Sequence, residues 1–212
     1  ANKGESTSQV LRECEAKMHI FEIQAKLFEK QEKRFKDSNL VRVHRLGWSD
    51  RVQEMQITMP RDSHELAGLY SPKGKWKNAL QLNETVKTIP LATFIQQEGL
   101  KHISYVIIDV EGKEPNVLRG MNLEAHQEDF PVFQLELGGT WTDSRHDEDQ
   151  WGQYAVAMYL TALGYKLFLM GEKMGKGDPM FLPVAAEFFR IVSFRPEVDV
   201  GGNLLVLHPN FA

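Results

Sequence analysis

Segments typical of strands and segments typical of helices alternate along most of this sequence, and that order constrains the fold more than any other feature. Apolar runs predict strands over residues 18–21, 40–46, 54–59, 85–89, 105–108, 132–137, 166–170, 189–194 and 203–207. Helical spacing of apolar residues predicts helices over residues 6–16, 25–35, 90–99, around 117–121, and over 150–163. This alternation predicts an α/β fold with an open sheet that is parallel except near its C-terminal edge.

The size and composition of the chain fit one domain over residues 1–212. Of its 212 residues, 42% are hydrophobic and 25% are charged, which is enough apolar material for a full core. Residues 61–83 are rich in Pro, Gly, Ser and Lys, and we interpret them as a long surface loop.

The charge pattern and the single cysteine limit the partners and the compartment. The formal charge of -4 comes from mixed charges without basic blocks, which argues against a nucleic-acid partner. No apolar run reaches the about 18 residues of a membrane span, so we expect no membrane contact within this chain. Cys14 falls on the apolar side of the first predicted helix, which predicts a buried thiol in a reducing, cytoplasmic compartment. The oligomeric state is not indicated.

Acidic residues follow the carboxyl ends of several predicted strands. They are Glu22, Asp50, Asp109, Glu111 and Glu136. In open α/β sheets, ligands bind beyond the carboxyl ends of the strands. We therefore predict that these acids meet at one functional rim.

Glu22 and Asp50 each allow two interpretations. Glu22 comes about 20 residues after a Gly-containing turn, the spacing at which an acid accepts hydrogen bonds from both hydroxyls of an adenosine ribose. It equally suits a solvated helix cap. Asp50, after Ser49, could meet an adenine amino group or serve as a polar turn residue.

Asp109 and Glu111 are two carboxylates just past the strand over residues 105–108, which we expect to be buried on both faces. Such acids can bind a metal, hold a substrate hydroxyl, or act as a general base when desolvation raises a pKa. The alternative is that they cap the following helix. Glu136 also ends a buried strand, where a carboxylate without a partner would be costly.

Three other segments invite a functional interpretation that their geometry weakens. Residues 146–149 read His-Asp-Glu-Asp, but contiguous side chains cannot all face one ion, which favours a charged first turn of the next helix. Trp141 and Trp151 could wall a pocket or serve as packing. Residues 171–177 contain Gly and Lys without the order of a phosphate loop.

The central part of the chain resembles the FkbM-type methyltransferases. The resemblance rests on Ile-Ile-Asp-Val-Glu-Gly-Lys-Glu at residues 107–114, Val-Leu-Arg-Gly at 117–120 and Phe-Gln-Leu-Glu at 133–136. It extends from residue 1 to about residue 207 and is strongest over residues 85–137. It implies a Rossmann-like class I methyltransferase fold, a three-layer sandwich with a mostly parallel sheet. It also implies an S-adenosylmethionine-dependent enzyme that methylates a hydroxyl of a sugar or other small molecule.

The resemblance also implies a set of cofactor-binding residues. In the family, the first strand ends in an Asp-x-Gly-Ala-Asn-x-Gly turn, and Ala1-Asn2-Lys3-Gly4 matches its second half. We therefore expect that the chain begins inside the cofactor loop and that the first, central strand is missing, which would leave open edges on two neighbouring strands. Glu22 would hold the ribose, although Ile23 replaces the family's usual Pro. The implied cofactor-binding residues are Ala1, Asn2, Lys3, Gly4, Glu22, Ser49, Asp50 and Asp109.

Methyl transfer to oxygen needs a proton acceptor and alignment of the two reactants. Asp109, Glu111 and Glu136 are the candidate catalytic residues. A divalent metal could acidify the hydroxyl, but no His joins these acids in sequence, so we assign no metal ligand. The alternatives are a non-catalytic methyltransferase-like binding module, an incomplete fragment, or a nucleotide-dependent dehydrogenase that uses Glu22 on a ribose. The Asp-x-Glu-Gly signature disfavours the dehydrogenase.

Overall fold

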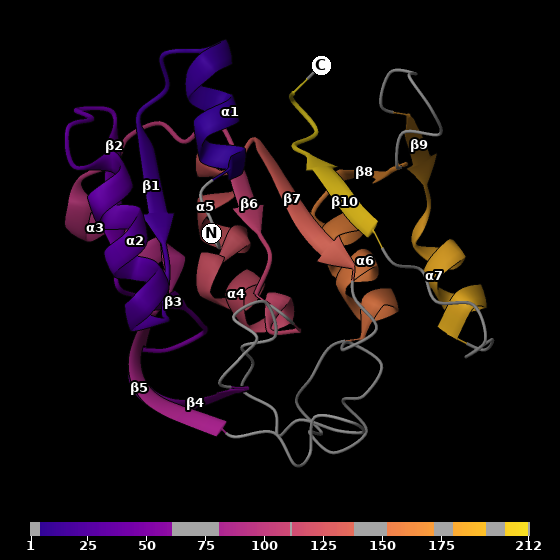
Figure 1. Ribbon diagram of the computed structural model, residues 1–212. Helices are drawn as coiled ribbons and strands as arrows, with labels where there is room; N and C mark the ends of the chain where they lie inside the picture. Colours follow the sequence, from indigo (N-terminus) through magenta and orange to yellow (C-terminus); the bar gives the residue numbers. More distant parts are fainter. Residues whose placement is uncertain are drawn as a thin grey trace. The chain divides into compact units, whose positions relative to one another are not determined.

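The computed structural model describes residues 5–60, 81–110, 112–137, 152–171, 180–193 and 202–211 (Figure 1). Most of the loop predicted over residues 61–83 lies outside these ranges. The chain divides into two compact units, Ala1–Ile89 and Pro90–Ala212, which are described one at a time. Both units combine strands and helices, which confirms the predicted α/β class.

The first unit begins with two helix–strand pairs. They are α1 (Glu5–Glu13), β1 (Met18–Phe21), α2 (Ala25–Phe35) and β2 (Val41–His44). Helix α2 has the predicted bounds because Leu27, Gln31 and Phe35 recur at helical spacing and are all buried. Strands β1 and β2 pair in parallel, and Ile20, Phe35 and Val41 form a core cluster with them.

A three-stranded sheet completes the first unit. Its strands are β3 (Gly47–Trp48), β4 (Gln53–Pro60) and β5 (Gln81–Ile89), in the order β3-β5-β4. The sequence did not predict β3, and β5 starts before the predicted residue 85, because antiparallel pairing along all of β4 holds its polar first residues in the strand. A Cβ on Gly47 would lie 3.0 Å from the Ile23 side chain, so this close approach suits glycine.

A carboxylate of β5 caps helix α2. The backbone N–H of Ala25 donates to Glu84 Oε2 at 2.9 Å, and Arg45 Nη2 donates to the same oxygen at 3.2 Å. Helix α2 has no acidic residue in its own first turn. Glu84 therefore supplies the negative charge that the start of a helix favours, although it comes from another part of the chain.

The second unit starts with elements whose local signals are clear. They are α3 (Leu91–Glu98), β6 (Val106–Ile108), α4 (Glu114–Met121), α5 (Leu123–His126), the 3-10 turn η2 (Gln127–Asp129) and β7 (Val132–Leu137). Helix α3 follows Pro90 and ends at Gly99, whose φ of 62° is the left-handed conformation that glycine adopts at little cost. The start and the end of α3 are thus confirmed.

The remaining elements finish a five-stranded sheet. They are α6 (Gln153–Ala162), β8 (Lys166–Met170), β9 (Phe181–Val184), α7 (Ala186–Ser193) and β10 (Gly202–Leu207). The order is β6-β7-β10-β8-β9, in which β6 and β7 are parallel and the other neighbours are antiparallel. Within the described residues, β1 pairs with β2 and β6 with β7, and no strand pairs with the second edge of β1 or β6.

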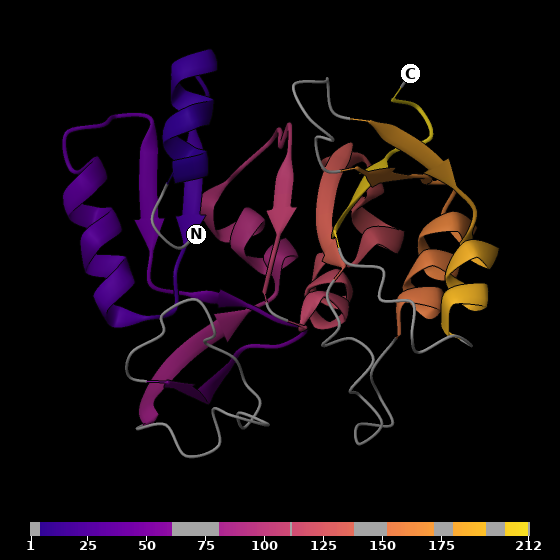
Figure 2. The same ribbon diagram turned by 45° about the vertical axis from the view of Figure 1, so that its right-hand side comes forward.

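The strand predicted over residues 189–194 is wrong, because residues 186–193 form α7. Helix α7 packs against α6, as Figure 2 shows, and Phe189 is buried. A short apolar run cannot distinguish a buried strand from one face of a helix. Strand β9 was not predicted.

Two predictions of burial are also wrong. The strand over residues 105–108 is not buried on both faces, since Tyr105 and Ile107 are 43% and 48% exposed. Among the described residues, β6 is the outermost strand of its sheet, and the exposed Ile107 lies between the buried Val106 and Ile108. The Cys14 thiol is exposed because α1 ends at Glu13, one residue before it.

None of the helices in the described part of the chain is both long and apolar enough to cross a membrane.

Candidate functional site

Two of the predicted catalytic acids lie at the same level of adjacent strands in the second unit. The parallel register places Ile108 of β6 beside Leu135 of β7, so Asp109 follows at the level of Glu136. Ile108 and Leu135 are buried, and alternation sends the next residue of each strand to the other face of the sheet. Asp109 is exposed and Glu136 is half-buried. The structure thus brings these two acids to one rim.

A row of polar side chains continues this face toward the amino ends of the strands. Tyr105 Oη donates to Gln134 Oε1 at 2.6 Å, and Gln134 Nε2 donates to Asn203 Oδ1 at 2.8 Å. Asn203 pairs in register with Glu136. Partial burial raises the pKa of the Tyr105 phenol, so it stays a hydrogen-bond donor at neutral pH. The acids therefore adjoin a polar face.

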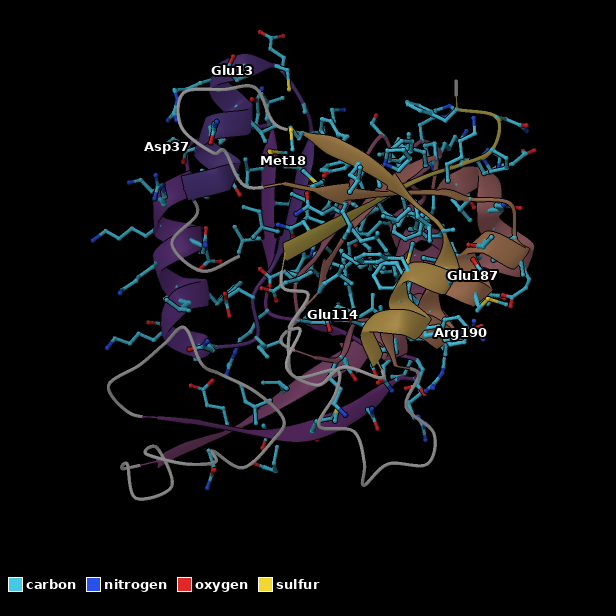
Figure 3. All side chains as sticks on the ribbon, turned by 90° about the vertical axis from the view of Figure 1, so that its right-hand side faces the viewer. Glu13, Met18, Asp37, Glu114, Glu187 and Arg190 are labelled. Carbon is cyan, nitrogen blue, oxygen red and sulfur yellow. The ribbon has the colours of Figure 1, made fainter. Side chains whose placement is uncertain are left out.

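Glu114, in the first turn of α4, is the last residue of the signature over residues 107–114 and was not among the candidate catalytic or cofactor-binding residues (Figure 3). Its side chain is 0% exposed, and its Oε1 accepts the N–H groups of Val110 at 2.9 Å and Gly112 at 3.3 Å. Gly112 has a φ of 95°, which glycine tolerates. No described residue gives Oε2 a hydrogen bond. Desolvation by burial raises the pKa of Glu114 above its usual 4.5, and the negative charge of Asp109 adds to this shift.

The position of Glu114 in the sequence does not indicate its burial. An acid in the first helical turn, followed by Pro115, is typical of a helix start and of a favourable interaction with the helix dipole. Such acids are commonly exposed. The complete burial of Glu114 depends on packing that its neighbours in sequence do not reveal.

In the first unit, Glu22 directly follows β1 and is 6% exposed. Its Oε1 accepts the N–H of Gln24 at 3.0 Å, and its own N–H donates to the His44 carbonyl at 3.0 Å. The interpretation of Glu22 as a solvated cap is therefore wrong, because the side chain is buried.

Aromatic rings line the segment next to Glu22. Phe21 stacks on His44 with ring centroids 5.0 Å apart, and it contacts Trp48 at 4.5 Å. His44 Nε2 also lies 3.0 Å from His19 Nδ1. The Trp48 Nε1 donor is buried and has no hydrogen-bond partner among the described residues. These contacts bring the end of β1 next to β3, which leads directly into Ser49 and Asp50.

Asp50 is held by its neighbours. Arg51 binds it through two contacts of 3.3 and 3.0 Å, and Ser49 Oγ donates to Asp50 Oδ1 at 3.1 Å. The hydrogen bond from Arg51 is the largest cause of the lowered pKa of Asp50, so this side chain is ionised and acts as an acceptor at neutral pH. Ser49 is buried beside it.

Several predicted site residues lie outside the described part of the chain. They are Ala1, Asn2, Lys3, Gly4, Glu111, Trp141, Trp151 and residues 146–149. Among the residues that the structure describes, no group of three or more His, Cys, Asp or Glu side chains could hold a metal ion.

Comparison with known proteins identifies one family. Residues 1–167 match the sequence model described as the methyltransferase FkbM domain. Among solved structures, the chain is similar to methyltransferase FkbM from Methylobacillus flagellatus KT, with 17% identity and a TM-score of 0.43. That match covers 65% of this chain and 31% of the other. No protein of curated function matches the sequence.

Proposed function

Because the chain belongs to the methyltransferase FkbM domain family, we propose that it is an S-adenosylmethionine-dependent methyltransferase that acts on a hydroxyl of a small molecule. The family match confirms the resemblance that the sequence indicated and supports a transferase. The observation that carries the choice of oxygen as the acceptor is the pair of acids at one rim, Asp109 and Glu136. A hydroxyl must lose a proton when it is methylated, and a carboxylate at that rim can accept it.

The cofactor side of the proposal rests on the first unit. Glu22 offers a buried carboxylate at the end of β1, and Phe21, the residue before it, contacts Trp48 with ring centroids 4.5 Å apart. This combination suits a nucleoside, whose ribose supplies hydroxyl donors and whose base supplies a flat apolar face. The Nε1–H of Trp48, which has no hydrogen-bond partner in the described part of the chain, and the ionised Asp50 add one donor and one acceptor. Glu22, Ser49 and Asp50 would therefore hold the adenosine part.

The bound cofactor would supply a methyl group attached to a positively charged sulfur. When the methyl group is transferred, the sulfur would keep the electron pair of the broken C–S bond. The residues of this chain then have two tasks. Asp109 orients the acceptor hydroxyl and takes its proton as the oxygen forms the new O–C bond. Glu136, at the same level of the next strand, offers a second acceptor for a hydroxyl of the substrate.

Turnover with a panel of acceptors tests this proposal. The protein is incubated with S-adenosylmethionine and sugars, polyols, hydroxylated polyketides or phenols, and products are measured by mass spectrometry. We expect S-adenosylhomocysteine and a singly O-methylated acceptor in equal amounts. Binding of S-adenosylhomocysteine without turnover on any acceptor would instead favour a non-catalytic binding module.

A further inference from the structure

The buried carboxyl of Glu114 contacts the loop that carries the acids of the rim. Its Oε1 accepts two backbone N–H groups, from Val110 at 2.9 Å and from Gly112 at 3.3 Å. Val110 directly follows Asp109, and Val110 and Gly112 flank Glu111 in the sequence. A single oxygen of Glu114 thus accepts the N–H groups of the residues before and after Glu111, and the first of these residues directly follows Asp109.

Burial of the Glu114 carboxyl is unfavourable in free energy. An apolar side chain of similar length would pack in the same place without desolvating a charge. Glu114 is 0% exposed, and its Oε2 has no hydrogen-bond partner among the described residues. Desolvation is the main cause of the raised pKa of Glu114, which means that burial disfavours the charged form of this carboxyl. Unlike a hydrocarbon side chain, the carboxyl supplies a hydrogen-bond acceptor for the N–H groups of Val110 and Gly112.

A role in helix capping does not account for this arrangement. A capping side chain accepts N–H groups from the N-cap residue or from the first turn of its own helix. Glu114 instead accepts the N–H groups of Val110 and Gly112, which both precede Lys113, the N-cap residue of α4. The bonds run from the helix back to the loop after β6.

We propose that Glu114 is a positioning residue, which fixes the backbone at Val110 and Gly112 through its two N–H···O bonds and so sets the direction of the Asp109 side chain. The part of this proposal that concerns turnover rests on the proposed function. The part that concerns the loop can be measured without any substrate.

The test compares two substitutions of similar shape. Glu114→Gln keeps a side-chain oxygen that can accept both N–H groups, whereas Glu114→Met keeps the length and removes the acceptor. Glu124→Gln and Glu124→Met are the matched controls, since Glu124 is an exposed acid of α5 that accepts a hydrogen bond from Tyr159 at 2.8 Å. Amide hydrogen exchange is measured at Val110 and Gly112, with the amides of β10 as an internal reference for global opening.

We expect Glu114→Met to lower the protection of the Val110 and Gly112 amides about tenfold or more, while β10 keeps its protection. Glu114→Gln should stay within about threefold of the parent, because its oxygen replaces the lost acceptor. In the same variants, kcat should fall about tenfold for Met and little for Gln, with KM for S-adenosylmethionine nearly unchanged. Neither Glu124 variant should change the exchange of the loop.

Unchanged protection of both loop amides in Glu114→Met would overturn the proposal. If the Met variant does not fold, Glu114→Ala, which also removes the acceptor, takes its place: a loss of loop protection of about tenfold or more with β10 intact supports the proposal, and unchanged protection contradicts it. An unmodified protein without turnover would contradict the proposed function, while the exchange data would still decide the role of Glu114.

Discussion

Replacing Asp109 by Asn is expected to lower turnover about a hundredfold or more, while the affinity for S-adenosylhomocysteine stays within about threefold. Asn has nearly the same shape as Asp but cannot take a proton from the acceptor hydroxyl. Asp109 is exposed at the level of Glu136, so the substitution leaves the buried side of the sheet intact. The measurement is kcat with a saturating acceptor, combined with a calorimetric titration of S-adenosylhomocysteine.

Asp129→Asn is the control for the Asp109 variant. Asp129 is a partly exposed acid of the same unit that contacts His126 at 3.1 Å, and it precedes the amino end of β7, whereas Asp109 follows the carboxyl end of β6. We expect no change in turnover from this control. Undiminished turnover in Asp109→Asn would remove Asp109 from the mechanism and leave Glu111 and Glu136 as the candidate bases.

Replacing Glu22 by Gln is expected to raise the Kd for S-adenosylhomocysteine about tenfold to a hundredfold, equivalent to about 1.5 to 3 kcal/mol. The change removes the negative charge that strengthens hydrogen bonds from ribose hydroxyls, and Glu22 is too buried for water to screen that loss fully. The Gln oxygen can still accept the N–H of Gln24, so the local structure should persist. Titration calorimetry measures the change directly.

Glu29→Gln provides the matched control, because Glu29 is an exposed acid on α2 in the same unit. This control should leave the Kd unchanged. An equal Kd for the Glu22 variant and the parent would show that Glu22 does not contact the cofactor, and its burial would then need a purely structural explanation.

The sequence predicted best those elements whose signals are local. Helix α2 has the expected bounds because its apolar positions and its end lie within one short segment. Gly99 ends α3 as expected, since a left-handed residue after a helix is a local requirement. Strand β9 and the first residues of β5 were missed because they depend on pairing with partner strands. Pairing of this kind is only weakly encoded in composition.

The acids of the candidate site were placed at strand ends correctly, but their environments could not be predicted. Glu22 and Asp109 both follow strands, yet one is buried and the other exposed. The difference comes from tertiary packing, since each is flanked by similar apolar residues in sequence. Glu114 shows the same limit more strongly, because its place at the start of α4 does not indicate that its side chain is 0% exposed.

The central claim is that this member of the family binds the methyl donor. Titration of S-adenosylhomocysteine into the chain tests that claim most directly. NADH serves as the comparison ligand. The account predicts one-to-one binding of S-adenosylhomocysteine and no binding of NADH. Absence of S-adenosylhomocysteine binding to the folded protein, or binding of NADH alone, would contradict it.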